Sequence, residues 1–331
     1  MKIRILPFAV FLLLISSVLL GQEKIVLNEN AQQAVQKKLI ESSKDHEKHR
    51  LSFELNAFNK EFVQTPRGES VVINFDSGSK LLRKGYPDLP KMSTSFIIPD
   101  RKKMKVKVVS SEYKEFKNID IAPSKGNITR DKNPENIPYT YGKAYEEDAF
   151  FPKKLATLQD PYIMRDFRGQ ALWIQPFQYN PVTKTLRVYM EMEVEITATE
   201  GKAQNTFKRK KSLEKVNNQF DLIYRSHFIN YPGTQKYDPL DEEGAMLIIS
   251  DASYMDAMQD FVDWKTQKGM QVEMVDVADI GRTSSDIDTY IENYYNNNDL
   301  AFVLLVGDGG TSSGQIPSLI VSTSDGDKNS D

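Results

Sequence analysis

Residues 186–196 of the chain read LRVYMEMEVEI, and apolar side chains alternate with polar ones along this run. The apolar positions are Leu186, Val188, Met190, Met192, Val194 and Ile196. A period of two is typical of a β-strand with one face in a core and the other face in water. The segment 179–184, YNPVTK, separates this strand from an apolar run at 171–176 and therefore predicts a hairpin.

Shorter runs with the same alternation lie upstream at 71–75, 94–98 and 104–109, and prolines recur between them. Short strands separated by turn residues favour a sandwich or a barrel over a parallel sheet. Residues 22–203 are therefore expected to form a β-rich, sandwich-like or barrel-like domain. Within it, the polar segment 31–50 is expected to be a helix.

The pattern changes at residue 245. Three continuous apolar runs, at 245–250, 272–277 and 300–306, alternate with two segments of helical spacing. Strands that are apolar on both faces and separated by helices are typical of a parallel sheet with right-handed crossovers. The chain is thus expected to be α+β overall, with an α/β region at 245–331 after the β-rich region.

Further signals concern the helix starts and the C-terminal end of the α/β region. Ser253 with Asp256, and Ser285 with Asp288, have the spacing of capping boxes. The final run 324–331, SDGDKNSD, is polar and is expected to be a loop. Because three parallel strands make a small core, we expect this domain to be truncated here and to continue beyond residue 331.

The composition argues against nucleic-acid binding and excludes cysteine chemistry within these residues. The chain has 331 residues and a formal net charge of -3, which argues against a nucleic-acid binder because such proteins usually have a basic excess. It contains no cysteine, so neither a disulfide nor thiol chemistry lies within these residues.

The N-terminus has the pattern of a secretory signal peptide. Lys2 and Arg4 precede an apolar run at 5–20, and the small residue Gly21 comes directly after it. We therefore expect residues 1–21 to be removed. The mature protein is expected to be secreted or held at the surface of a bacterium, and to meet a membrane only during export.

A glycine-rich stretch, GDGGTSSG at 307–314, comes after the last apolar run. It lacks the glycine spacing of a dinucleotide-binding loop and the lysine of a phosphate-binding loop. It does contain G-x-S-x-G, the pattern of a hydrolase nucleophile, with Ser312 at the serine position. Because no histidine follows Ser312 and no helix is expected after it, a flexible loop is the favoured interpretation.

The histidines give weak signals. His46 and His49 are spaced by three on the expected polar helix, where a zinc pair is one interpretation and a solvated face is the favoured one. His227 is isolated among aromatic residues and is expected to be packed or at the surface.

An acidic run gives the strongest metal signal. Asp325, Asp327, Asn329 and Asp331 fall at alternate positions, the spacing by which a calcium loop converges its oxygen ligands. The sixth position of that loop is serine rather than the usual glycine. A calcium site and a plain acidic loop tip both stay open, and no other cofactor is indicated.

Five short motifs carry a family resemblance when they are taken in their order along the chain. They are GYPDLP at 85–90, PFQYNP at 176–181, MLIIS at 246–250, FVDWK at 261–265 and FVLLVGD at 302–308. The first two resemble the propeptide of gingipain-type cysteine peptidases, and the last three resemble the beginning of their catalytic domain. The chain therefore resembles the precursor of such a peptidase.

The resemblance implies a caspase-like α/β fold for residues 245–331 and peptide-bond hydrolysis by a cysteine–histidine dyad. It implies that the dyad lies beyond residue 331, so no catalytic or cofactor-binding residue is assigned within this chain. It also implies that residues 22–203 are a propeptide, which packs on its own catalytic domain, assists folding and maintains latency. Proteins and peptides would be the substrates of the full-length enzyme.

Residues 204–244 are polar and basic, and they are expected to link the two regions. Under the resemblance, the maturation cut is expected at Arg209, Lys210, Lys211 or Arg225, with a solvated charge run as the alternative. Two other functions stay open. The protein could be a non-catalytic secreted relative that binds partners or assists surface assembly, or a serine hydrolase that uses Ser312.

Overall fold

The chain divides into two compact units, unit 1 at residues 1–208 and unit 2 at residues 209–331. Most of the predicted signal peptide, residues 1–20, lies outside the described residues. No helix in the described part of the chain is long and apolar enough to cross a membrane. The computed structural model describes residues 21–330 except 210–212, 214, 233–237, 241–243, 299, 311, 313, 318 and 324–325.

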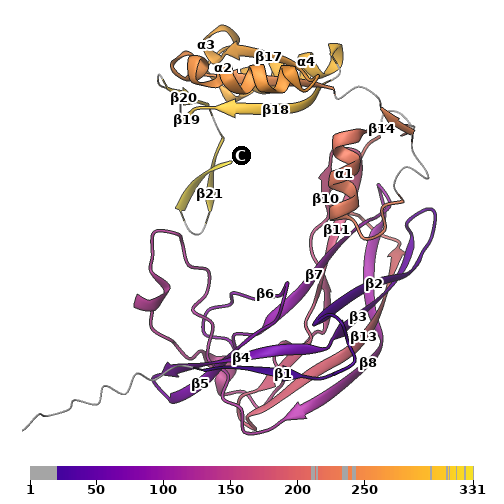
Figure 1. Ribbon diagram of the computed structural model, residues 1–331, viewed down its shortest axis with the longest axis vertical. Helices are drawn as coiled ribbons and strands as arrows, with labels where there is room; N and C mark the ends of the chain where they lie inside the picture. The colour runs from indigo at the N-terminus through magenta and orange to yellow at the C-terminus, as the bar shows by residue number, and fades with distance from the viewer. Residues whose placement is uncertain are drawn as a thin grey trace, which may run out of the picture. The chain divides into compact units, whose positions relative to one another are not determined.

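Unit 1 is built from antiparallel sheets, with three of them among its described residues (Figure 1). The first has the order β12 (Phe177–Asn180), β13 (Thr185–Thr199), β3 (Lys48–Leu55), β2 (Val35–Ser42), and β8 (Lys103–Phe116) also pairs with β13. The second has the order β10 (Tyr162–Met164), β11 (Phe167–Ile174), β7 (Pro90–Ile97), β6 (Ser79–Lys80), and β9 (Ala156–Leu158) also pairs with β11. The third consists of β1 (Gln22–Val26), β4 (Ala57–Thr65) and β5 (Gly68–Asn74). Two short helical turns come after β8, η1 (Pro134–Asn136) and η2 (Lys143–Tyr145).

Strand β13 lies at the centre of the first sheet and pairs with β3, β8 and β12. Five of its six alternating apolar side chains are buried, as the sequence predicted. The sixth, Met190, is half-buried at a bulge, where the register with β8 shifts between Tyr189 and Glu191. The predicted hairpin exists, but the strand that precedes β13 in it is β12. Residues 171–174, which were expected to form that strand, belong to β11 of the second sheet.

Residues 31–50 contain strands, and the prediction of a polar helix there is wrong. Their many Lys, Gln and Glu residues favour a helix locally. However, β3 lies between β2 and β13 and forms hydrogen-bonded ladders with both. Because β2 has a free edge in water, its charged side chains are tolerated there. Pairing with neighbouring strands therefore overrides the local propensity.

His49 occupies a core position, not the solvated helix face that the sequence suggested. Strand β3 buries His49, Leu51, Phe53 and Leu55 at alternate positions. The His49 ring packs edge-on to Phe96 with 5.3 Å between ring centroids, and its Nδ1 shares a 2.9 Å hydrogen bond with the Ser42 hydroxyl. Burial disfavours the charged imidazolium and lowers the pKa of His49 from 6.5 to about 4.

Unit 2 contains the predicted parallel sheet. Strand β16 (Ala245–Ser250) lies between β17 (Gln271–Asp276) and β18 (Leu300–Val306), and both neighbours run parallel to it. Helix α2 (Ala252–Gln267) connects β16 to β17, and α3 (Val277–Ile280) and α4 (Ser284–Asn297) connect β17 to β18. The shorter elements are β14 (Lys215–Asn217), α1 (Asn218–His227), β15 (Asp238–Leu240), β19 (Asp308–Gly309), β20 (Gln315–Ile316), β21 (Leu319–Thr323) and β22 (Gly326–Ser330).

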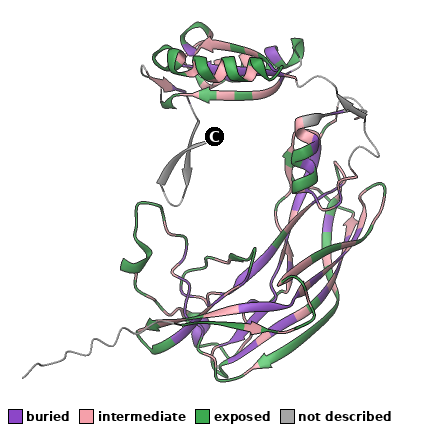
Figure 2. Ribbon diagram, in the orientation of Figure 1, coloured by how far each residue is buried: buried purple, intermediate pink, exposed green. Residues whose placement is uncertain are grey.

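Strand β16 is buried on both faces, which explains its continuous apolar sequence. Leu247 and Ile249 pack in a cluster with Ile287 of α4. Met246 and Ile248 pack in a second cluster, on the side of α2. The two helices therefore cover opposite faces of the sheet, and the outer surface of α2 stays exposed to solvent (Figure 2).

The N-caps of α2 and α4 lie two residues before the predicted ones. Asp251, not Ser253, caps α2 by accepting a 3.1 Å hydrogen bond from the Ser253 amide. Thr283, not Ser285, caps α4 by accepting a 3.1 Å bond from the Asp286 amide. The capping chemistry was predicted correctly, but its position was not.

Two segments that were expected to be irregular contain regular structure. The predicted linker at 204–244 includes α1 and the parallel pair β14–β15. Phe220 and Tyr224 lie one turn apart on α1, and the Phe220 ring stacks on Phe302 of β18 with centroids 5.4 Å apart. The predicted polar loop at 324–331 includes β22, which pairs antiparallel with β21.

We expect unit 1 to lose stability as the pH falls from 6.5 towards 4. The unfolded chain binds a proton at His49 more readily than the folded chain does, so acid favours unfolding. The lowered pKa corresponds to about 3 kcal/mol between these limits. Denaturant unfolding of the chain above and below this range measures the loss, and His49→Gln should flatten the pH dependence.

His46→Asn is the matched control for this experiment. His46 lies in the turn between β2 and β3 with a φ of 59°, which asparagine tolerates. Between pH 6.5 and 4, this variant should lose more stability than His49→Gln does. An unchanged pH dependence in His49→Gln would contradict the role of His49.

Candidate functional site

The carboxyl ends of β16 and β18 lie side by side at one edge of the parallel sheet. The chain leaves β16 through α2 over one face and reaches β18 through α4 over the other. The Asp251 amide donates a 3.2 Å hydrogen bond to the Val306 carbonyl, which joins the two strand ends. Because open α/β sheets form their sites where the direction of winding changes, this edge is the candidate site.

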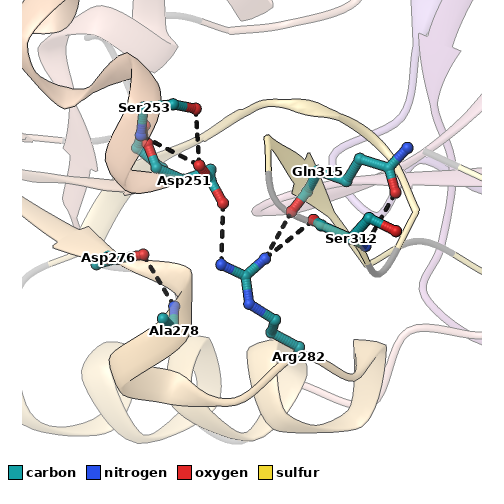
Figure 3. A network of polar contacts seen from close by, with 8 residues as sticks. Asp251, Ser253, Asp276, Ala278, Arg282, Ser312 and Gln315 are labelled. Carbon is teal, nitrogen blue, oxygen red and sulfur yellow. Dashed lines mark hydrogen bonds and ion pairs between the residues drawn. The ribbon is translucent and has the colours of Figure 1, made fainter.

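An ion pair between Asp251 and Arg282 occupies the candidate site (Figure 3). Asp251 is 2% exposed and directly follows β16, while Arg282 lies in the turn between α3 and α4. Arg282 Nη2 donates to Asp251 Oδ2 at 2.9 Å. The Ser253 hydroxyl and amide donate to the other carboxylate oxygen at 2.7 and 3.1 Å. Both oxygens of the buried carboxylate therefore have donors.

The same guanidinium holds the glycine-rich loop after β18. Arg282 Nη1 donates to the carbonyls of Ser312 and Gln315 at 3.1 and 3.5 Å. The Gln315 side chain accepts a 2.9 Å hydrogen bond from the Ser312 amide, and β19 pairs with β20 at the base of the loop. The described residues of this loop are thus held in place, in contrast to the flexible loop that the sequence suggested.

The pKa of Asp251 is held well below its usual range. The hydroxyl and the amide of Ser253 are the main causes, and the Arg282 guanidinium adds to them. A carboxylate whose pKa lies far below physiological pH is a weak general base, because it has little affinity for a proton. The pair therefore orders two loops at the candidate site and supplies no acid–base chemistry.

Ser312 does not have the setting of a serine nucleophile. A nucleophile elbow places the serine at a sharp turn between a strand and a helix. Here β18 ends at Val306, and the next regular element after Ser312 is β20. No hydrogen bond between Ser312 and a histidine is found within unit 2, where His227 ends α1 with its ring against Phe228 and Ser312 uses its carbonyl and amide within the loop, as far as the described residues go.

Within the described ranges, no group of three or more His, Asp or Glu side chains could hold a metal ion. The rings of His46 and His49, for which a zinc pair was one interpretation, lie with their centroids 6.0 Å apart, but no third His, Asp or Glu ligand joins them among the described residues.

Two protein-family models match the chain in succession. The model described as Propeptide_C25 matches residues 29–237, and the model described as Peptidase family C25 matches residues 240–331. The chain belongs to peptidase family C25. It comprises the propeptide of that family and the beginning of its peptidase domain.

Three curated C25 relatives come from Porphyromonas gingivalis. Gingipain R2 is 43% identical over 265 residues, which cover 78% of this chain and 36% of the relative. Gingipain R1 is 42% identical over 266 residues, which cover 78% of this chain and 26% of the relative. Lys-gingipain is 25% identical over 280 residues, which cover 80% of this chain and 16% of the relative. The chain therefore spans 36% or less of the length of these relatives.

A solved structure from the same organism is similar in sequence and in fold. It is described as "Complex of Porphyromonas gingivalis RgpB pro- and mature domains". Its TM-score is 0.54 and its sequence identity is 42%, over 59% of this chain and 97% of the matched chain.

The predicted maturation residues lie upstream of the boundary between the two C25 family matches, which falls between 237 and 240. Arg209 is half-buried in an irregular segment, and Lys210 and Lys211 lie outside the described residues. Arg225 is on α1, where its side chain pairs with Asp221 one turn earlier.

The predicted calcium ligands fall at the end of unit 2. Asp325 and Asp331 lie outside the described residues, and Asp327 and Asn329 belong to β22, of which only the backbone is described. Calcium binding stays a prediction.

Sequence reasoning missed Asp251 and Arg282. A signal for Asp251 was present, because an acidic residue directly after a buried strand and before a helix stands at the carboxyl edge of the sheet. Arg282 belongs to no recognisable pattern in the sequence. Its role emerges only when the turn between α3 and α4 brings it against the loops after β16 and β18.

We expect Arg282→Met to loosen the loop after β18 and to destabilise unit 2, because it leaves the Asp251 carboxylate without its cation. Hydrogen exchange should speed up at the Gly310 and Gln315 amides, which are bonded within the loop at 2.9 and 3.1 Å. Amides of β16 should keep more of their protection. The control is Lys268→Met, which changes an exposed cation at the end of α2. Equal exchange in both variants would contradict the role of Arg282 in holding the loop after β18.

Proposed function

We propose that this chain is the front part of the zymogen of a secreted cysteine endopeptidase. Its propeptide assists folding and keeps the enzyme latent by packing on its own catalytic domain. The cysteine and histidine of the catalytic dyad lie beyond residue 331. The full-length enzyme cleaves proteins or peptides.

The observation that carries this proposal is the succession of the two family matches, with propeptide first and peptidase second. The similarity to Gingipain R2 and Gingipain R1 supports it over 78% of the chain. The RgpB structure is described as a complex of pro- and mature domains, and we transfer this association to the present chain.

The chemistry of unit 2 is consistent with the proposal. A thiolate that attacks a peptide carbonyl needs an imidazole for proton transfer and backbone amides that stabilise the oxyanion. Such groups must be held within fractions of an ångström, which requires rigid supporting loops. The Asp251–Arg282 pair supports two loops at the carboxyl edge of the sheet, next to which later strands of the peptidase domain would bring the dyad.

Finer features of the proposal rest on sequence patterns. We propose a sandwich-like fold for the propeptide and a caspase-like fold for the complete peptidase domain. Residues 1–21 act as a signal peptide for export from a bacterial cell. Calcium bound by Asp325, Asp327, Asn329 and Asp331 is supported by their alternation and by the oxygen ligands that they offer.

The mature protein is expected to begin between residues 210 and 240, after one of the predicted basic residues or at the boundary between the family matches. Arg209 is favoured over Arg225, because a protease needs an extended segment, and Arg209 lies in an irregular segment whereas Arg225 lies within a helix. Lys210 and Lys211 stay candidates from their sequence alone. N-terminal sequencing of the mature full-length protein measures this position. A start upstream of Lys202 would exclude a cut in the linker.

The processed full-length protein is expected to cleave peptide substrates, and a thiol-alkylating reagent should abolish the cleavage. The chain ending at residue 331 is the control and should show no thiol-dependent cleavage, because it has no cysteine. An inactive processed protein would instead support a non-catalytic relative. Activity that survives alkylation but is lost in Ser312→Ala would support a serine hydrolase.

A further inference from the structure

Arg168 is a fully buried arginine of β11 whose guanidinium binds backbone carbonyls. Its Nη1 donates to Pro99 and Lys102 at 2.7 and 2.8 Å. Its Nε donates to Asn205 at 2.8 Å, and its Nη2 donates to Gln204 at 2.6 Å. One side chain thus joins the loop after β7 to the segment that leaves β13.

Two further hydrogen bonds hold the segment that leaves β13, residues 204–207, which we call the exit segment. The Asn205 side-chain amide donates to the Pro161 carbonyl at 3.0 Å. The Phe207 amide donates to the Asp100 carbonyl at 2.9 Å. The chain therefore stays attached to unit 1 from the end of β13 as far as Phe207, and unit 2 begins at residue 209.

Burial makes these contacts obligatory. A guanidinium out of water needs acceptors for its donors, and detachment of residues 204–205 would leave two of the Arg168 donors without theirs. A lysine could not replace this arginine, since a single ammonium cannot reach carbonyls on two segments as a planar fork can. Detachment of the exit segment is thus opposed by the loss of acceptors for Arg168 as well as by the loss of the segment's own hydrogen bonds.

The position of this contact matters because lysines lie on both sides of it. Lys202 and Lys208 are both exposed, so burial of the side chain protects neither of them from a protease that cuts after basic residues. They differ in the backbone around them. Lys202 precedes the residues that Arg168 holds, whereas the chain beyond Lys208 belongs to unit 2.

We propose that Arg168 is a positioning residue that latches residues 204–207 onto unit 1, so that proteolysis after basic residues spares Lys202 and acts beyond Phe207. The latch rests on the proposed function only in that it treats unit 1 as a propeptide that is released whole. It fixes where the released propeptide ends, and it leaves the choice among the basic residues downstream to the protease.

Limited digestion of the whole chain with trypsin, together with mass spectrometry of the fragments, tests the latch. In the wild-type chain, cuts beyond Phe207 should appear before any cut after Lys202, and the bond after Lys202 should stay intact. In Arg168→Met, cleavage after Lys202 should become at least about tenfold faster, because cleavage follows the population of the open segment. Arg168→Lys should resemble Arg168→Met.

Arg187→Met is the matched control, since Arg187 is another arginine of unit 1 but binds the Glu115 side chain at 2.9 Å and not the exit segment. It should leave Lys202 protected. Cleavage after Lys202 that is as fast as cleavage beyond Phe207 in the wild-type chain would overturn the latch. So would an Arg168→Met chain that keeps Lys202 intact.

Hydrogen exchange of the wild-type chain tests the latch even if the variants do not fold. The Phe207 amide should be protected, and the Lys208 amide should exchange faster. Equal exchange at the two positions would refute the latch. Trypsin is supplied from outside, so an inactive full-length protein would disprove the proposed peptidase without affecting this result.

Discussion

A guanidinium that is taken out of water must find acceptors, and this requirement connects segments that lie far apart in the sequence. Arg168 joins the loop after β7 to the exit from β13, more than a hundred residues downstream. In unit 2 the buried charge is the Asp251 carboxylate, and the half-exposed Arg282 binds it and joins the cap of α2 to the loop after β18. In each of these two cases, one planar cation with several donors joins loops that are distant in the sequence. His49 meets the same requirement differently, because burial keeps its ring neutral.

The fold was predictable wherever apolar periodicity was strong. The alternation at 186–196 predicted the central strand of unit 1, and the runs at 245–250 and 300–306 predicted two strands of the parallel sheet with their observed bounds. It was not predictable at β2 and β3, where a polar composition favours a helix and only pairing with β13 selects the strand. Capping residues were recognised by type and misplaced by two positions, since several Ser, Thr and Asp residues stand near each helix start.

The candidate site was less predictable than the fold. Serine and acidic motifs attract attention because their chemistry is known, yet Ser312 contributes its backbone carbonyl and amide to a structural loop. The residues that organise the site, Asp251 and Arg282, lie 31 positions apart and share no motif. Their proximity results from the winding of the sheet, which places the end of β16 beside the end of β18.

The place of β13 in the chain constrains the order in which unit 1 assembles. It is the last long strand of the unit, and yet β3, β8 and β12 all pair with it. During synthesis from the N-terminus, β3 and β8 are made long before the strand that joins them into one sheet. Such non-local pairing makes folding slow, and it postpones closure of the sheet until nearly all of the unit has been made. Until then the edges of the early strands are unpaired. The chain therefore stays incompletely folded, and accessible to other proteins of the cell, until synthesis of unit 1 is nearly complete.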